Sequence, residues 1–223
     1  MAADRTLGNE VRDFAEWHLG RRYFLVWAVS IADEQIRARV DAAQQCLSPW
    51  LIADYRRQHH ITVHVCGFPA RERLQPDDFP FAAAFRQFDA LRNMAGTARG
   101  PFELEIGGFG SFSSAPYLPV ADPTGRLEQF RQLLAVEGVE VRDVEYVPHI
   151  TLGLYRGAHE VADIVAATRS LRQQPAITLP VRYLDLLAYE ASVIGGPLQI
   201  VYRLDLVNNL LFPGKLFSLL RAP

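Results

Sequence analysis

Cysteine is scarce in this sequence: Cys46 and Cys66 are the only two, and they form no CxxC pair. A disulfide scaffold and a cysteine-based structural zinc site are therefore not expected. The longest apolar run, from Tyr23 to Ala32, is about ten residues long, which is too short to span a bilayer. The N-terminus lacks the basic start and apolar stretch of a secretory signal. We expect a reduced, cytoplasmic protein that makes no membrane contact.

Lysine is almost absent, because Lys215 is the only lysine among 23 basic residues and the others are arginines. The net charge of −2 excludes a global basic field that would attract long nucleic acids. Arginine suits phosphate binding, since its planar fork donates two parallel hydrogen bonds. A GC-rich genome, which favours arginine and alanine codons, is the simpler explanation of the bias.

The chain has 223 residues, of which 49% are hydrophobic and 22% charged, so it is long and apolar enough for one domain or two small lobes sharing a core. Apolar periodicity and turn residues predict a mixture of strands and helices. Strands are expected at 23–31, 60–68, 102–109, 111–120, 147–155, 177–190 and 198–206, and helices within 1–20 and at 33–47, 81–91, 125–137 and 161–171.

This order is typical of an α+β fold. We expect two pseudo-symmetric lobes, each with an antiparallel-type sheet backed by helices, and a central cleft between them. The expected organisation is an N-terminal helical extension (1–20), a single bilobal domain (21–206, with halves 21–120 and 121–206) and a C-terminal tail (207–223).

One short motif occurs twice, at corresponding places in the two halves. His60-Ile61-Thr62-Val63 is followed later in the chain by His149-Ile150-Thr151-Leu152. Alternate side chains of a strand project to the same face, so each copy presents an imidazole beside a hydroxyl, while the isoleucines point into the core. If the two strands meet across an approximate two-fold axis, the cleft between the lobes holds both pairs.

Two facing imidazoles suit phosphoryl hydrolysis or transesterification. Histidine has an ordinary pKa of about 6.5, so near neutrality one ring can take a proton from the attacking group while the other protonates the leaving oxygen. Threonine hydroxyls on the same face can donate hydrogen bonds to the non-bridging phosphate oxygens. This chemistry requires no metal and no cofactor.

At these residues the sequence resembles the 2H phosphoesterase superfamily, which includes 2′,3′-cyclic phosphodiesterases and proteins named 2′-5′ RNA ligases. The early strand YFLVWAVSI and the segment YEASVIGGPLQIVYRLDL extend the resemblance over residues 21–206. It implies metal-independent hydrolysis of 2′,3′-cyclic phosphate ends of RNA or nucleotides, reversible toward 2′-5′ ligation. By motif match, His60 and His149 are the catalytic pair, and Thr62 and Thr151 bind phosphate. The match does not assign which histidine is the acid and which the base.

The expected partner is an RNA end or a small cyclic nucleotide, bound by a monomer that has no obligate protein partner. Two alternatives stay open. One is an RNA-end or nucleotide binding module of the same fold that has lost turnover. The other is a metal hydrolase that uses His60, His64 and His149, although positions i and i+4 of a strand lie about 13 Å apart, too far for one ion without a bend.

Further residues near the motifs have two interpretations each. Tyr155 is an even number of residues from His149 and Thr151, so a continuous strand would place it on the same face. It either lines the cleft and stacks on a base or packs as an ordinary strand aromatic. His64 continues the face of His60 and is either a cleft residue that binds substrate or a histidine satisfied in the core. Four arginines flank the first motif and either steer phosphate or form a solvated face: Arg56, Arg57, Arg71 and Arg73.

Overall fold

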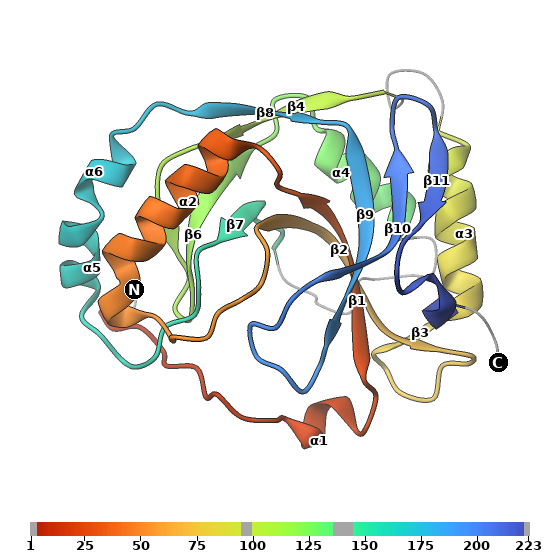
Figure 1. The fold of residues 1–223 in the computed structure, drawn as a ribbon, viewed down its shortest axis with the longest axis horizontal. Helices are drawn as coiled ribbons and strands as arrows, with labels where there is room; N and C mark the ends of the chain where they lie inside the picture. Colours follow the sequence, from red (N-terminus) through yellow and green to blue (C-terminus); the bar gives the residue numbers. More distant parts are fainter. Residues whose placement is uncertain (1–3, 95–99, 136–144, 221–223) are drawn as a thin grey trace.

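The two strands that carry the repeated motif lie side by side near the middle of one curled, antiparallel sheet (Figure 1). The computed structural model describes residues 4–94, 100–135 and 145–220. Its sheet has 11 strands, in the order β11-β10-β9-β1-β2-β7-β6-β4-β8, with β3 paired to β2 and β5 paired to β6. The strands are β1 (Tyr23–Ser30), β2 (His60–Ala70), β3 (Asp78–Pro80), β4 (Phe102–Ile106), β5 (Gly110–Ser111), β6 (Pro116–Ala121), β7 (His149–Thr151), β8 (Ile177–Val181), β9 (Tyr183–Glu190), β10 (Gln199–Asp205) and β11 (Leu210–Pro213).

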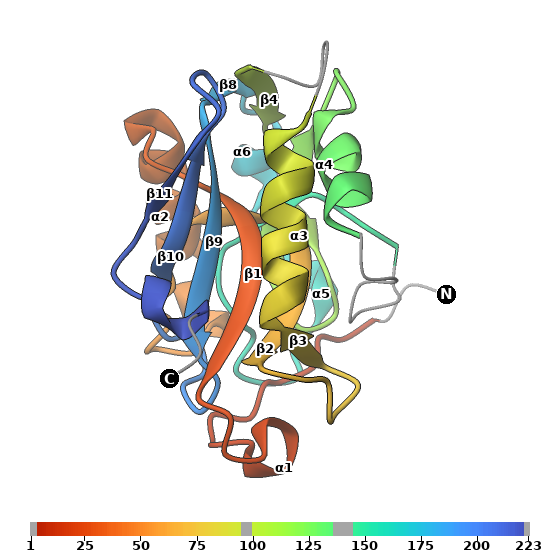
Figure 2. The same cartoon turned by 90° about the vertical axis from the view of Figure 1, so that its right-hand side faces the viewer.

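The sheet has two wings, which meet between β2 and β7: one runs from β2 to β11 and the other from β7 to β8. Helices cover both wings. They are α1 (Ala15–His18), α2 (Glu34–Leu47), α3 (Phe81–Arg92), α4 (Arg126–Leu134), α5 (Val161–Ala167) and α6 (Arg169–Arg172), with 3₁₀ turns η1 (Ser48–Trp50) and η3 (Phe217–Leu220). On the β1–β10 wing, Figure 2 shows α3 along the sheet, where the Phe88 ring lies 5.8 Å from Trp27 and 4.9 Å from Tyr202. On the other wing, α2 lies in front of β6 in Figure 1, and Gln44 Nε2 donates to the carbonyl of Leu152, just after β7, at 2.9 Å.

The sequence accounts well for α2 and β1. The Asp33 carboxylate accepts a hydrogen bond from the Ile36 amide at 3.0 Å and so caps the first turn of α2. The stripe predicted on this helix is buried in the main core, and consists of Ile36, Val40, Ala43 and Leu47. Strand β1 is apolar on both faces because both are covered. Its second face joins a smaller cluster that contains Phe24, Val26, Val65 and Phe68.

The α+β and antiparallel predictions are confirmed, but the two wings do not coincide with the two halves of the sequence. One wing contains β1 and β2 together with β9, β10 and β11 from the end of the chain, and the other contains β4 and β6 together with β7 and β8. The segment 177–190, expected to be one long strand, is divided at Arg182 into β8 in one wing and β9 in the other. Each wing is therefore built from both halves.

The expectation of a helix in the first twenty residues is largely wrong, since within residues 4–20, the part that the structure describes, only Ala15–His18 is helical. Leu7 and Val11 are 61% and 66% exposed, whereas the Trp17 ring packs against Phe24 and Phe68 at 5.2 and 5.1 Å. Residues 5–9 instead run as a strap held by backbone hydrogen bonds, from Thr6 N to the His159 carbonyl (2.9 Å) and from Asn9 N to the Tyr155 carbonyl (2.8 Å). The tail also contributes structure, because β11 forms an edge of the sheet.

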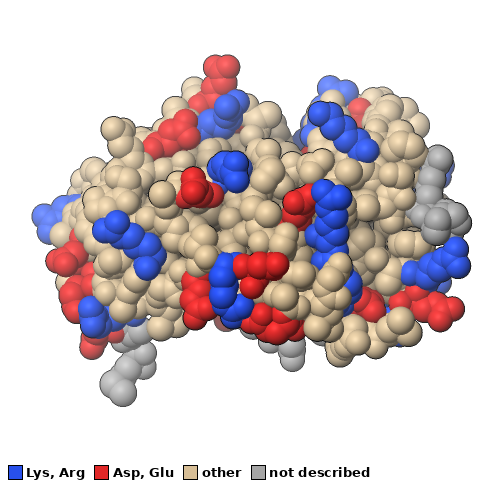
Figure 3. Space-filling view, turned by 60° about the horizontal axis from the view of Figure 1, so that its bottom comes forward, with Lys and Arg blue, Asp and Glu red and all other residues tan. Residues whose placement is uncertain are grey.

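On the face seen in Figure 3, basic and acidic side chains are interspersed. This agrees with the net charge of −2. Within the described ranges, no helix has the length and hydropathy that crossing a membrane requires.

Candidate active site

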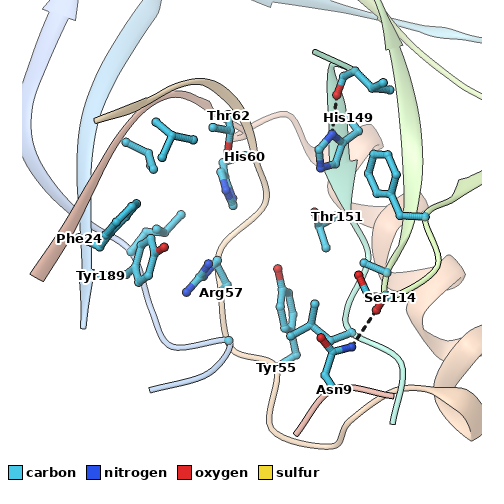
Figure 4. Close-up of a pocket in the computed structure, with 18 of the residues that line it drawn as sticks. Asn9, Phe24, Tyr55, Arg57, His60, Thr62, Ser114, His149, Thr151 and Tyr189 are labelled. Atoms are coloured by element: carbon cyan, nitrogen blue, oxygen red, sulfur yellow. Dashed lines mark hydrogen bonds between the residues drawn. The ribbon is translucent and has the colours of Figure 1, made fainter. Parts of the chain in front are cut away.

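The two wings of the sheet join at β2 and β7, and this junction positions the repeated motif. The strands pair antiparallel with Ile61 opposite Ile150, which places His60 opposite Thr151 and Thr62 opposite His149. Both isoleucines are fully buried in the main core. Because neighbouring residues of a strand project to opposite faces, all four polar side chains project to the other face. Figure 4 shows the two imidazole–hydroxyl pairs on opposite sides of one pocket.

The pocket has a volume of about 630 Å³ and includes both histidines and both threonines of the motif in its lining. Arg57 and Arg131 are its basic residues. Much of the remaining lining is aromatic or apolar, and includes Phe24, Val26, Tyr55, Val65, Phe112, Tyr146, Leu154, Tyr189 and Leu198. A pocket of this size and mixed character fits a small ligand with a polar end and an apolar ring.

Each imidazole is held in one tautomer by a backbone carbonyl two residues before it. His60 Nδ1 lies 2.8 Å from the Gln58 carbonyl, and His149 Nδ1 lies 2.6 Å from the Val147 carbonyl. A carbonyl oxygen only accepts, so Nδ1 carries the proton and donates in both rings. In the neutral ring the lone pair therefore resides on Nε2, which leaves each histidine one nitrogen to accept or deliver a proton.

Burial lowers the pKa of both histidines, so each ring is less readily protonated than a histidine in water. Burial lowers the pKa of His60 to about 4, and the charges of Arg57 and His149 oppose its protonation further, while the Gln58 carbonyl works in the other direction. Burial also lowers the pKa of His149, against the effect of the Val147 carbonyl. Both rings are therefore neutral at pH 7 in the ligand-free protein. A bound phosphodiester anion would raise both pKa values, because it stabilises the charged form.

Aromatic rings enclose His149. The centroid of the Phe112 ring is 5.0 Å and that of Tyr117 is 5.3 Å from the imidazole, and the two aromatic rings stack on each other at 4.4 Å. Tyr117 is positioned by β6, where it lies opposite Thr151. This packing restricts the orientation of the imidazole and contributes to the burial that lowers its pKa.

The two threonine hydroxyls face the pocket without competing partners. Among the residues that the structure describes, neither the Thr62 nor the Thr151 hydroxyl has a hydrogen-bond partner, although both side chains are half-buried. A half-buried hydroxyl needs a partner, which water or a ligand oxygen can supply. Both hydroxyls are thus available to donate to an anion placed between the imidazoles.

The structure places His64 away from this pocket, as a buried residue. Strand β2 contains a register irregularity, because Thr62 pairs with Ala28 while His64 pairs with the next β1 residue, Trp27. Val63 is the extra residue, so the alternation slips and Val65 is the next side chain to reach the pocket after Thr62. The interpretation of His64 as a cleft residue is not supported by this placement.

Tyr155 is also outside the pocket, in the main core, with its hydroxyl 2.8 Å from Ser111 Oγ. Strand β7 ends at Thr151, and Gly153 has a φ of 154°, a conformation that side chains other than glycine rarely adopt. The alternation from which we placed Tyr155 beside His149 therefore stops before reaching it. Its alternative interpretation, ordinary aromatic packing, describes its position.

Most of the pocket lining was not identified from the sequence, and Asn9, Tyr55 and Arg57 are examples. Asn9 comes from the N-terminal strap, where its side-chain amide donates to the carbonyls of Ser114 (2.8 Å) and Tyr155 (3.0 Å). Tyr55 and Arg57 precede β2. Of these, only Arg57 had a signal, as one of the arginines flanking the first motif. Arg56, next to it, is exposed and outside the pocket lining.

Comparison with known proteins bears on the fold and the family. A family model described as the 2′-5′ RNA ligase superfamily matches residues 32–192, a range that contains both copies of the motif. The chain belongs to this superfamily. The resemblance inferred from the two tetrads is thereby confirmed. No curated protein matches the sequence.

Solved structures support the same fold for this superfamily member. E. coli LigT complexed with ATP is 15% identical, with a TM-score of 0.52 over 83% of this chain and 99% of that one. The protein TT0787 of Thermus thermophilus is 17% identical, with a TM-score of 0.53 over 82% and 97%. A structure titled as a phosphoesterase is 16% identical, with a TM-score of 0.50 over 89% and 99%. At these identities the likeness establishes the fold alone.

Donors for a metal ion are sparse: within residues 4–94, 100–135 and 145–220, no group of three or more His, Cys, Asp or Glu side chains could hold one. The trio suggested by the sequence, His60, His64 and His149, is not such a group, because the bulge at Val63 separates His64 from the pocket.

Proposed function

We propose that this protein is a phosphodiesterase that hydrolyses 2′,3′-cyclic phosphate ends of RNA or of nucleotides, with His60 and His149 as general base and general acid and without a metal ion. The observation that supports this most is the paired geometry at the β2–β7 junction. There, two imidazoles with Nδ1 held by carbonyls face one pocket together with two threonine hydroxyls that have no hydrogen-bond partner among the described residues.

In the proposed reaction, a water molecule attacks phosphorus while one histidine Nε2 takes its proton. The bond from phosphorus to one ribose oxygen breaks, and the Nε2–H of the other histidine protonates that oxygen. The product is a ribose phosphomonoester. If a 5′-hydroxyl attacks the cyclic phosphate in place of water and the bond from phosphorus to the 3′-oxygen breaks, the product is a 2′-5′ linkage with a free 3′-hydroxyl. Thr62 and Thr151 donate to the non-bridging oxygens as negative charge grows on them.

The electrostatic environment favours His60 as the base. Its pKa of about 4 keeps the ring neutral over most of the pH range, and the nearby charge of Arg57 opposes its protonation. His149 has no such cation among the causes of its lowered pKa. We therefore assign the proton in the reactive complex to His149, which would deliver it to the leaving oxygen.

A substrate panel tests the proposal. Purified protein is incubated with 2′,3′-cyclic nucleotides, cyclic-ended RNA and 2′-5′ dinucleotides in the presence of EDTA, and the products are separated by chromatography. We expect hydrolysis of the cyclic phosphates at the same rate with and without EDTA. Binding without product would support the binding-module alternative, and activity abolished by EDTA would support a metal hydrolase.

A further inference from the structure

Arg57 and Arg131 are the two arginines in the pocket lining, and neither exchanges a proton in the proposed mechanism. Arg131 already donates to the Val63 carbonyl at 2.8 Å and lies 3.7 Å from the Glu128 carboxylate, so Arg57 is the candidate for a further role. Its guanidinium carbon lies 4.0 Å above the centroid of the Tyr189 ring, and its Nε donates to the Gly196 carbonyl at 3.2 Å. In the part of the chain that the structure describes, no carboxylate forms an ion pair with it. Figure 4 shows the side chain within the pocket, on the same side as His60.

The segment that carries Arg57 is fixed by its neighbours rather than free to move. The Arg56 amide donates to the Gly195 carbonyl at 2.9 Å, and the Leu198 amide donates to the Gln58 side chain at 2.7 Å. The Gln58 carbonyl in turn holds His60. One segment therefore positions the guanidinium and the catalytic ring together, and a guanidinium stacked on an aromatic face loses little freedom when it binds an anion.

The positive charge of the Arg57 guanidinium makes protonation of His60 less favourable. A planar guanidinium with open donors is matched by a phosphate, which accepts two parallel hydrogen bonds. The reacting phosphate already has partners in the two threonine hydroxyls. Along the chain, and in Figure 4, His60 separates Arg57 from Thr62. The three residues from Arg57 to His60 span at most about 10 Å of chain.

We propose that Arg57 binds a second phosphate of the substrate, one ribose away from the cyclic phosphate. This inference rests on the proposed function and narrows its substrate class to phosphate-bearing RNA ends or 5′-phosphorylated nucleotides, in preference to an isolated nucleoside 2′,3′-cyclic phosphate. The second phosphate is either a 5′-phosphomonoester or the phosphodiester of a preceding nucleotide.

Three substrates with the same base test this specificity: a nucleoside 2′,3′-cyclic phosphate, its 5′-phosphorylated form, and a dinucleotide that ends in the cyclic phosphate. We expect wild-type kcat/KM to be about 10-fold or more higher for at least one of the two-phosphate substrates, the range expected for a charge-assisted pair. At pH 7, where burial keeps His60 neutral even without the charge of Arg57, Arg57→Gln should remove that advantage and change kcat/KM for the one-phosphate substrate by less than about threefold. If Arg57→Gln lowers kcat/KM for the 5′-phosphorylated nucleotide, the second phosphate is a 5′-phosphomonoester. If it lowers kcat/KM for the dinucleotide, the second phosphate is the phosphodiester of the preceding nucleotide.

Arg56→Gln is the matched control, because it removes the same charge from the adjacent exposed position and should leave all three values unchanged. Arg57→Lys retains the charge and should keep part of the preference, and thermal melting checks that each variant is folded. An equal loss on all three substrates would overturn the proposal, since Arg57 would then act on the reacting phosphate or on His60. Equal wild-type values for the three substrates would overturn it as well.

A failure of the proposed function is distinguishable from a failure of this inference. If the wild-type protein turns over none of the substrates, binding of a nucleoside 3′,5′-bisphosphate and a nucleoside 3′-monophosphate is measured by calorimetry. A bisphosphate preference that Arg57→Gln abolishes supports the role of Arg57 without any turnover. Equal affinities for the two ligands overturn it.

Discussion

We expect kcat/KM for hydrolysis of a cyclic phosphate to be highest below pH 7. The profile of kcat/KM against pH reports the free enzyme, in which burial lowers the pKa of His60 to about 4 and that of His149 below its usual value. Activity requires one neutral ring and one protonated ring. The profile should therefore be bell-shaped, with a rising limb near pH 4 and a falling limb below about pH 6.5.

The size of the effect follows from these pKa values. Above the pKa of the acid, its protonated fraction falls about tenfold for each pH unit. From pH 6.5 to pH 8.5, kcat/KM should therefore fall by about 10²-fold. The profile of kcat reports the complex, in which the bound phosphate anion raises both pKa values, so its optimum should lie at higher pH.

The assay is steady-state hydrolysis of a 2′,3′-cyclic nucleotide from pH 4 to 9 at constant ionic strength, with EDTA present. Enzyme held at each pH and then assayed at pH 6 controls for unfolding. A flat kcat/KM profile between pH 5 and 9, or a falling limb centred above pH 7, would refute the reasoning from burial. In His149→Gln, the residual activity should keep the rising limb and lose the falling limb. The opposite result would exchange the two roles.

Other consequences of the structure are open to measurement. Thr62→Val and Thr151→Val should each lower kcat by roughly 10- to 100-fold through lost hydrogen bonds to the phosphate, and unchanged kcat in both would remove them from the mechanism. Gln87→Ala should lower the free energy of unfolding by about 1–3 kcal/mol, because the buried Trp27 indole loses its 2.8 Å acceptor. Urea denaturation measures this, with the exposed Gln132→Ala as control, and equal stabilities would contradict it.

The positions of the motif residues were predictable because they depend on local rules. Strand alternation places His60 and Thr62 on one face, and the buried isoleucine between them confirms which face is the core. The cap and apolar stripe of α2 were predictable in the same way, since Asp33 and the residues that follow act within one turn of helix.

The errors arise where tertiary contacts override the local pattern. The bulge at Val63 turns His64 away from the pocket, and the turn at Gly153 leaves Tyr155 in the core. The N-terminal strap is held by backbone hydrogen bonds to loops far along the chain, and apolar spacing carries no sign of such bonds. Arg57 was one of several arginines flanking the motif in sequence, and its place in the pocket lining, stacked on Tyr189, distinguishes it from them in the structure.

Turnover of a 2′,3′-cyclic phosphate by wild type, His60→Gln, His149→Gln and the double variant tests the paired-imidazole mechanism most directly. Each single substitution should lower kcat by at least about 10²-fold. The double variant should lose little more than either single one, because the two rings act as a unit. Wild-type turnover in either folded single variant would contradict the mechanism.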